Sequence, residues 1–178
     1  MNEQASSARV IEDKGDELEI LLERRIGHEP AAVWHMLTEP AALPRWLAPG
    51  AVEPRIGGRA RLDFAESGAT IDSTVRACDP ERLLVYAWGS GDGPDRPLYW
   101  ALIPVEDGTQ LRLTLRLPAD EDGPKAAAGW DAHLEMLLAA LEGVPIRFPV
   151  DHFLAMRAWF RGQLGASADT ATAGARGA

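Results

Sequence analysis

Apolar and polar residues alternate along residues 17–27, the first segment of the chain with a clear pattern. Its regularly spaced apolar residues are Leu18, Ile20, Leu22 and Ile26. This period of two predicts a β-strand with one buried face. Residues 110–117 repeat the pattern most clearly, because polar or charged residues separate Leu111, Leu113, Leu115 and Leu117. We therefore expect both segments in a sheet with one face on the core and the other in water.

Four further strands are expected between these two segments, over residues 59–66, 69–78, 81–89 and 97–105. The breaks between them are short and contain Gly, Asp, Ser or Pro, so successive strands should pair antiparallel. Residues 81–89 are apolar on both faces, so both faces should be covered. The direction of the side chains in residues 81–89 and 97–105 stays open: either Trp100 or its neighbours Tyr99 and Ala101 point inward.

Helices are expected on either side of this run of strands. Two short helices follow the first strand, one after Pro30 and one around residues 43–47, where Pro44 limits the length. A long helix over residues 124–142 follows the last strand, with an apolar stripe formed by Trp130, Leu134, Leu137, Leu138 and Leu141. Such a stripe must be buried, and the sheet supplies the surface. A further helix is expected over residues 151–164.

The order of these elements predicts a single α+β domain. The length of 178 residues agrees with one domain and is enough for a full core. We divide the chain into a flexible N-terminus (1–15), the domain (16–143), an appended C-terminal helix (144–164) and a disordered tail (165–178).

Charge and cysteine content narrow the partners and the compartment. The net charge of −9 argues against a nucleic-acid partner, which would need clustered Lys and Arg. Cys78 is the single cysteine, so an intrachain disulfide is excluded and a reducing cytoplasm is favoured. The first residues lack the pattern of a signal peptide, and no apolar run approaches the ~20 residues that span a bilayer. We expect a cytoplasmic protein without a membrane span, and the abundant Ala, Gly and Arg suggest a bacterial source.

Four short motifs occur together in a characteristic order. They are the segment 30–40, the triplet Arg45-Trp46-Leu47, the turn Gly57-Gly58-Arg59 and the helix opening Gly129-Trp130. In this order they resemble the family named for the C-terminal domain of the heat-shock protein 90 ATPase activator. That family belongs to the SRPBCC superfamily, also called START-like or birch-pollen-allergen-like. The resemblance covers residues 18–143.

The resemblance implies a helix-grip fold, in which a curved antiparallel sheet wraps around the long C-terminal helix. It also implies a cavity between sheet and helix that often holds an apolar small molecule. Our first hypothesis is therefore binding of a hydrophobic ligand, such as a lipid, a polyketide or an aromatic metabolite. The alternatives are a cyclase, dehydratase or hydrolase that uses the same cavity, and an interaction protein like the chaperone ATPase activator.

Eight residues are the candidates for lining this cavity: Trp34, Trp46, Trp88, Trp100, Trp130, His133, Leu134 and Leu137. Tryptophan is large and amphipathic and lines apolar pockets well, although core packing is the more common role of any single tryptophan. Trp88, Trp100 and Trp130 are the better candidates, because they belong to the sheet and the long helix. His133 falls on the flank of the apolar stripe, where it could bond a ligand at the rim or lie in water. For an enzyme, His133, Tyr86 and Tyr99 are the acid–base candidates.

Motifs for metal, cofactor or covalent chemistry are missing from the sequence. The four histidines show no paired ligand spacing, and no nucleophile elbow, P-loop or dinucleotide fingerprint occurs. Asp131 and Glu135 share a helix face away from the apolar stripe, so we expect both to be solvated. We therefore assign no catalytic residue, no metal and no cofactor, and favour a binding protein over an enzyme. The helix over residues 151–164 packs either on its own domain or on a second copy, which would give a homodimer.

Overall fold

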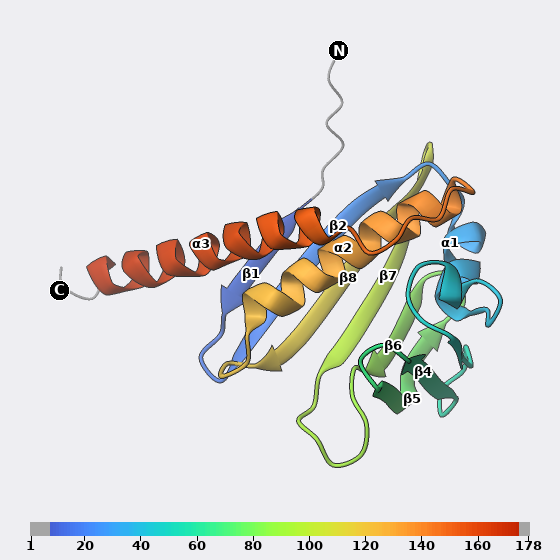
Figure 1. Cartoon of the computed structure of the whole chain (residues 1–178), viewed down its shortest axis with the longest axis horizontal. Helices are drawn as coiled ribbons and strands as arrows, with labels where there is room; N and C mark the ends of the chain where they lie inside the picture. The colour runs from blue at the N-terminus through green and yellow to red at the C-terminus, as the bar shows by residue number, and fades with distance from the viewer. Residues whose placement is uncertain (1–7, 175–178) are drawn as a thin grey trace.

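One curved antiparallel sheet and the helix held against it form the frame of the protein (Figure 1). The computed structural model describes residues 8–174, in which eight strands pair in the order β1-β2-β8-β7-β6-β5-β4-β3. The strands are β1 (Arg9–Asp13), β2 (Glu17–Ile26), β3 (Gly50–Val52), β4 (Arg59–Phe64), β5 (Ala69–Asp79), β6 (Leu83–Ala87), β7 (Pro97–Val105) and β8 (Gly108–Pro118). The helices are α1 (Pro30–Thr38), the 3-10 helix η1 (Leu43–Arg45), α2 (Gly123–Leu141) and α3 (Val150–Gly174). The predicted α+β helix-grip fold is confirmed.

Alternate side chains of the central strands point toward α2, which resolves the directions that the sequence left open. Trp100 of β7 is fully buried, whereas Tyr99 lies on the outer face with the guanidinium of Arg116 over its ring. The neighbouring strand β6 has the same alternation, since Leu84 and Tyr86 are buried on the inner face. Burial raises the pKa of the Tyr86 phenol far above its ordinary value, so this hydroxyl stays neutral.

The second short helix is reduced to the single 3-10 turn η1. Pro44 lies at its centre, and a proline cannot donate the hydrogen bond that a longer helix would need. Trp46, directly after this turn, is fully buried, and its Nε1 donates to the carbonyl oxygen of Met36 at 2.8 Å. This hydrogen bond fixes the segment after α1 against the core.

Residues 9–13 correct the prediction of a flexible N-terminus, because they form strand β1 along β2. Ile11 is buried in the core, and Arg9 donates from Nε to the carboxylate of Asp131 in α2 at 2.7 Å. One buried side chain is too short a pattern to predict a strand, and the ion pair joins residues far apart in sequence. Residues 1–7 of the predicted flexible segment lie outside the described residues.

Helix α3 packs on its own domain, against α2 and β1 (Figure 1). The side chains on its inner face are Phe153, Met156, Phe160 and Leu164. The predicted helix ends at Leu164 and is followed by a disordered tail, but in the structure α3 continues to Gly174, through a segment rich in the strong helix former alanine. Residues 175–178 lie outside the described residues. In residues 8–174, no helix is long and apolar enough to cross a membrane.

Replacement of Phe160 by alanine is expected to destabilise the protein, because its side chain is completely buried beneath α3. We expect the free energy of unfolding to fall by roughly 3–5 kcal/mol, measured by urea denaturation. Trp159 provides the matched control, since it is 43% exposed on the same helix and its loss should cost about 1 kcal/mol or less. Equal losses for the two variants would contradict the packing of α3 on this domain.

Candidate functional site

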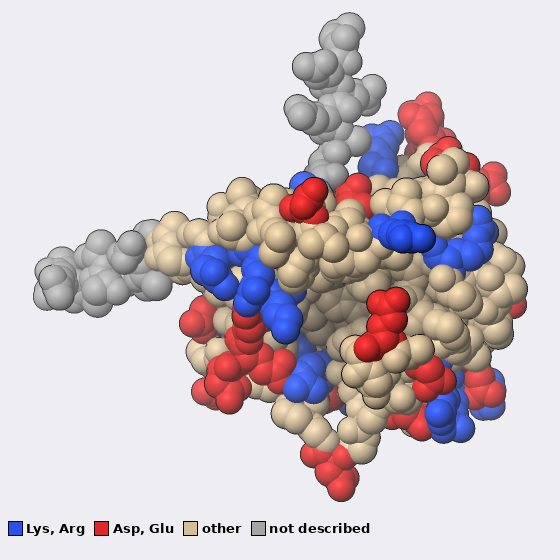
Figure 2. Space-filling model, in the orientation of Figure 1, with Lys and Arg blue, Asp and Glu red and all other residues tan. Residues whose placement is uncertain are grey.

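A pocket of about 810 Å³ opens between α2 and the inner face of the sheet. Figure 2 shows the hollow on this face of the molecule, walled mainly by uncharged residues. The sheet contributes side chains from β4, β5 and β8 and from the loop between β6 and β7. The other wall is α2, to which the segment before α3 adds Phe148 and the first turn of α3 adds Phe153. The long helix therefore lies against the sheet without filling the space between them.

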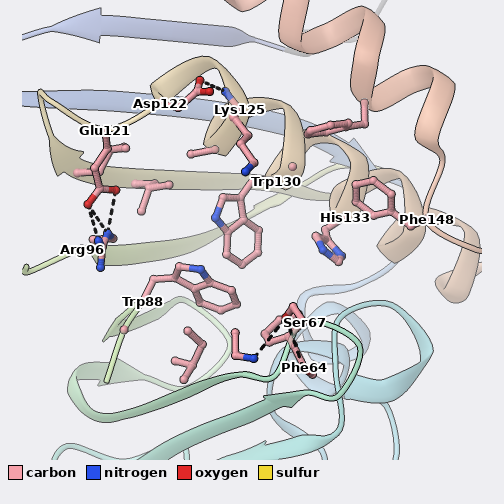
Figure 3. Close-up of a pocket in the computed structure, with 18 residues that line it drawn as sticks. Phe64, Ser67, Trp88, Arg96, Glu121, Asp122, Lys125, Trp130, His133 and Phe148 are labelled. Carbon is pink, nitrogen blue, oxygen red and sulfur yellow. Dashed lines mark hydrogen bonds and ion pairs between the residues drawn. The ribbon is translucent and has the colours of Figure 1, made fainter. Parts of the chain in front are cut away.

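Aromatic rings pack edge to face along the pocket (Figure 3). Trp88 meets Trp130 with ring centroids 4.6 Å apart, and Phe64 meets Trp88 at 5.7 Å, both at steep interplanar angles. Farther along the same side of α2, Phe148 packs edge-on against the His133 ring at 5.4 Å. Such edge-to-face pairs are worth about 0.5–1.5 kcal/mol each beyond area burial, so the rings hold one another in place without a ligand.

Three of the eight candidate residues line the pocket: Trp88, Trp130 and His133. The other five are packed in the core: Trp34, Trp46, Trp100, Leu134 and Leu137. Two of these tryptophans support the pocket from behind, because Trp100 contacts the Trp130 ring at 5.6 Å and Trp46 contacts Trp100 at 6.0 Å.

Most of the lining residues come from positions that sequence reasoning did not single out. Leu115 and Leu117 carried a usable signal, since both lie on the inward face of the alternating strand over residues 110–117. The sequence signal at Lys125 and Gly129 was weaker and consisted only of the helix face that they share with His133. Phe148 had no such signal, because the irregular segment after α2 has no periodicity that would predict the direction of the Phe148 side chain.

His133 presents a hydrogen-bond acceptor to the pocket. Its Nδ1 lies 3.0 Å from the carbonyl oxygen of Trp46, and a carbonyl oxygen only accepts, so Nδ1 carries the proton. In the neutral ring Nε2 is then an unprotonated acceptor, and it has no hydrogen-bond partner among the described residues. Burial lowers the pKa of His133, and the bond to Trp46 offsets that only in part. The ring is therefore neutral at pH 7.

A proton titration of the histidine rings by NMR tests this assignment. We expect the His133 resonance to titrate below the ordinary histidine pKa of about 6.5. The unfolded chain then binds the proton more tightly than the folded one, so protonation of His133 disfavours the fold as the pH falls below about 6.5. A His133→Gln variant assigns the resonance, and a midpoint at or above the ordinary value would refute a buried neutral ring.

Charged residues gather where α2 begins, at one end of the pocket (Figure 3). Arg96 donates from Nε to both carboxylate oxygens of Glu121 at 2.9 Å. Asp122 caps the helix by accepting from the backbone N–H of Lys125 at 2.9 Å, and it also accepts from Arg157 at 2.7 Å. The ammonium group of Lys125 has no hydrogen bond or ion pair within the part of the chain that the structure describes. Lys125 is thus a cation at this end that remains available to an anion.

Gly129 keeps the middle of the helix face open. Lys125, Gly129 and His133 follow one another at intervals of four residues, so they lie on one side of α2, and all three line the pocket. A Cβ atom built on Gly129 would meet no atom within 4 Å. Glycine within a helix costs about 0.5–1 kcal/mol relative to alanine, and neither steric crowding nor a positive φ requires it here.

Asp131 corrects the expectation of a solvated carboxylate, because it is completely buried. Its Oδ1 accepts from Arg9 Nε at 2.7 Å and from Arg24 Nη2 at 2.5 Å, and its Oδ2 lies 2.6 Å from His152 Nε2. Burial alone would raise the pKa of Asp131, but Arg24, Arg9 and His152 outweigh it and hold the pKa below the ordinary value. No local pattern predicts this arrangement, because its partners come from β1, β2 and α3, far from Asp131 in the chain.

The same cluster brings together three groups with the spacing of a metal centre. Donor atoms of Asp131, Glu135 and His152 lie within 4.8 Å of one another. However, Arg24 reaches both carboxylates, at 2.5 Å for Asp131 and 3.3 Å for Glu135, and Arg9 adds a second guanidinium. A divalent cation would have to enter beside two fixed positive charges. The cluster is therefore an ion-pair network that joins β1, β2, α2 and α3.

Comparison with known proteins identifies a family for most of this fold. The sequence model of the family described as "Activator of Hsp90 ATPase homolog 1-like protein" matches residues 28–142. This range includes Trp88, Trp130 and His133, whereas β1, Phe148 and Phe153 lie outside it. A comparison with curated proteins gave no significant match.

Solved structures share the fold at low sequence identity. CalU16 from Micromonospora echinospora is 21% identical with a TM-score of 0.71, and the match covers 90% of this chain and 98% of that chain. Protein MLL2253 from Mesorhizobium loti is 27% identical with a TM-score of 0.61, covering 72% and 99%. DynU16, a protein in the dynemicin biosynthetic locus, is 24% identical with a TM-score of 0.62, covering 73% and 49%.

Proposed function

We propose that this chain, which belongs to the family of Activator of Hsp90 ATPase homolog 1-like proteins, binds a hydrophobic small molecule between α2 and the sheet. The observation that carries the proposal is the pocket of about 810 Å³, which lies within the range of about 300–1,000 Å³ typical of ligand sites. Its walls are aromatic and aliphatic, with charged groups at one end and a single imidazole beside the rings.

The energetics of the pocket favour an occupant. Trp88 and Trp130 turn ring surface toward the open space, and an apolar ligand would remove that surface from water at about 25 cal/mol per Å². The edge-to-face packing of the rings leaves little reorganisation to be made on binding, which keeps the entropic cost low. A fold shared with a protein of a biosynthetic locus agrees with a small-molecule ligand such as a lipid, a polyketide or an aromatic metabolite.

Two experiments test the proposal. The first is solvent extraction of the purified protein followed by mass spectrometry, and the second is a thermal-shift screen of lipids and aromatic compounds. We expect either a bound apolar molecule in the extract or a saturable rise in Tm. A ligand at 100 times its Kd adds about 2.7 kcal/mol, which corresponds to a rise of roughly 5–10 °C for a chain of this size. An empty extract together with an unchanged Tm across the whole screen would overturn the proposal.

Two alternatives use other features of the chain. A cyclase, dehydratase or hydrolase would need acid–base groups in the pocket, and of the three candidates His133 lines it, while Tyr86 lies in the core and Tyr99 on the outer face. The available lone pair on His133 suits a general base, so loss of turnover in a His133→Gln variant would support an enzyme. Activation of a chaperone ATPase, which the family description names, is a separate hypothesis that an ATPase assay tests directly.

The homodimer through the C-terminal helix remains a prediction. The inner face of α3 is used within the chain, so a second copy would have to contact the side chains that stay exposed, which include Leu154 and Trp159. A Leu154→Glu/Trp159→Glu variant should then convert the dimer to a monomer in sedimentation or light-scattering measurements. A wild-type chain that is already monomeric would exclude the dimer.

A further inference from the structure

We propose that the ligand of this pocket is an aromatic amphiphile, with an anionic group bound by Lys125 and a hydroxyl that donates to Nε2 of His133. This inference rests on the function proposed above and specifies its ligand class. Three features carry it: the charges at the start of α2, the hydrogen-bonding state of His133 and the open helix face between them (Figure 3).

The charges at the pocket end select an anion. Arg96 is neutralised by Glu121, and the carboxylate of Asp122 is held by Arg157 and by the helix N-terminus. Lys125 lines the same end, and its side chain extends toward Trp130 in Figure 3. A ligand carboxylate at this place would meet an ammonium group that has no competing partner among the described residues, so it would be favoured over a neutral or cationic group.

The imidazole selects a hydrogen-bond donor. Because Nδ1–H is committed to the carbonyl of Trp46, the ring can offer only the lone pair of Nε2. A hydroxyl can donate to this lone pair, whereas a second carboxylate would meet it as one acceptor facing another. The aromatic neighbours of the ring, Trp130 and Phe148, leave few other polar partners for a ligand at this end.

The spacing of the two anchors sets the size of the ligand. Lys125 and His133 are eight residues apart on α2, which corresponds to about 12 Å along the helix axis. Gly129 lies halfway, and a Cβ atom at that position would meet no atom within 4 Å. Rings of Trp88, Trp130 and Phe64 border it, so flat aromatic rings fit between the two anchors better than a branched or globular group.

Four naphthalenes provide the matched probes: 6-hydroxy-2-naphthoate, 2-naphthoate, 2-naphthol and unsubstituted naphthalene. The first carries both groups at opposite ends of the ring system, and the others lack one group or both. Calorimetric titration should give the tightest binding for the first. We expect Lys125→Met to weaken the two acids by roughly three- to tenfold and to leave 2-naphthol unchanged. Lys14→Met, which changes the chain's other lysine at a site outside the pocket, should leave all four unchanged.

His133→Phe should weaken the two hydroxyl compounds by roughly two- to tenfold and leave 2-naphthoate unchanged. His133→Gln serves as the second variant, and thermal unfolding shows whether each variant is folded. Equal binding of all four probes, unaffected by the Lys125 and His133 variants but lost in Gly129→Leu, would overturn this inference and leave the proposed function standing. Failure of all four probes to bind would overturn the inference, while the extraction and the wider screen decide the proposed function separately.

Discussion

Replacing Gly129 by leucine is expected to reduce ligand binding by at least about tenfold while the fold stays intact. The new side chain would enter the open space in front of Gly129, between Trp130 and the rings of the sheet. A leucine in that place takes the volume that the ligand needs, and the loss should therefore affect every ligand, whatever its charge. Removal of a glycine from the middle of a helix should at the same time stabilise the fold by about 0.5–1 kcal/mol.

Gly162 provides the matched control for this variant. It also lies within a helix, has open space around its Cβ position and is exposed on α3 outside the pocket. Gly162→Leu should bring a similar gain in helix stability and leave the binding isotherm unchanged. If both variants bound ligand like the wild-type protein, the ligand would have to bind somewhere other than in front of α2.

Replacing Asp131 by asparagine is expected to destabilise the fold strongly. The change leaves the guanidinium of Arg24, which is itself buried, beside a neutral amide instead of a carboxylate. Breaking a buried ion pair by removing one partner costs roughly 3–5 kcal/mol, because the remaining charge loses its partner. Glu135, whose Oε1 lies 3.3 Å from Arg24, compensates that charge only in part. Urea denaturation at neutral pH measures this loss. The difference should shrink only below about pH 4, where Asp131 becomes protonated in the unfolded chain, since its pKa in the fold is held below the ordinary value.

Asp95→Asn is the matched control on the surface. Asp95 is paired with Arg76 through two hydrogen bonds at 2.6 and 3.0 Å, but both side chains are about half exposed. Removal of an exposed partner of this kind should cost less than about 1 kcal/mol. Similar losses at Asp131 and Asp95 would mean that the buried network contributes no more than a surface pair.

The sequence predicted the fold where a segment carried its own pattern. Strand β8 has strict alternation over its whole length, and α2 has a wide apolar stripe, so both were found within a few residues of their observed ends. Strand β1 buries only Ile11 and has too few residues to show a period. Strand β3, with three residues, was missed for the same reason. Short strands depend on their partners for stability, and that dependence cannot be seen in the segment itself.

The site was predictable only as far as the helix face that forms it. Trp130 and His133 followed from the expected position of α2 against the sheet. Asp131 was placed in water because it lies away from the apolar stripe of α2, yet α3 covers that side through an ion network. Phe148 reaches the pocket through a chain reversal after α2. Both misses arise from tertiary contacts that have no local periodicity.

Binding of an apolar ligand between α2 and the sheet can be tested by NMR of the protein with bound 2-naphthoate. We expect intermolecular nuclear Overhauser effects from the naphthalene protons to the indole protons of Trp88 and Trp130. Trp159, which is exposed on α3 and does not line the pocket, serves as the internal control and should show none. Contacts to Trp159 alone, or saturation without any contact to Trp88 and Trp130, would show that the ligand does not bind in this pocket.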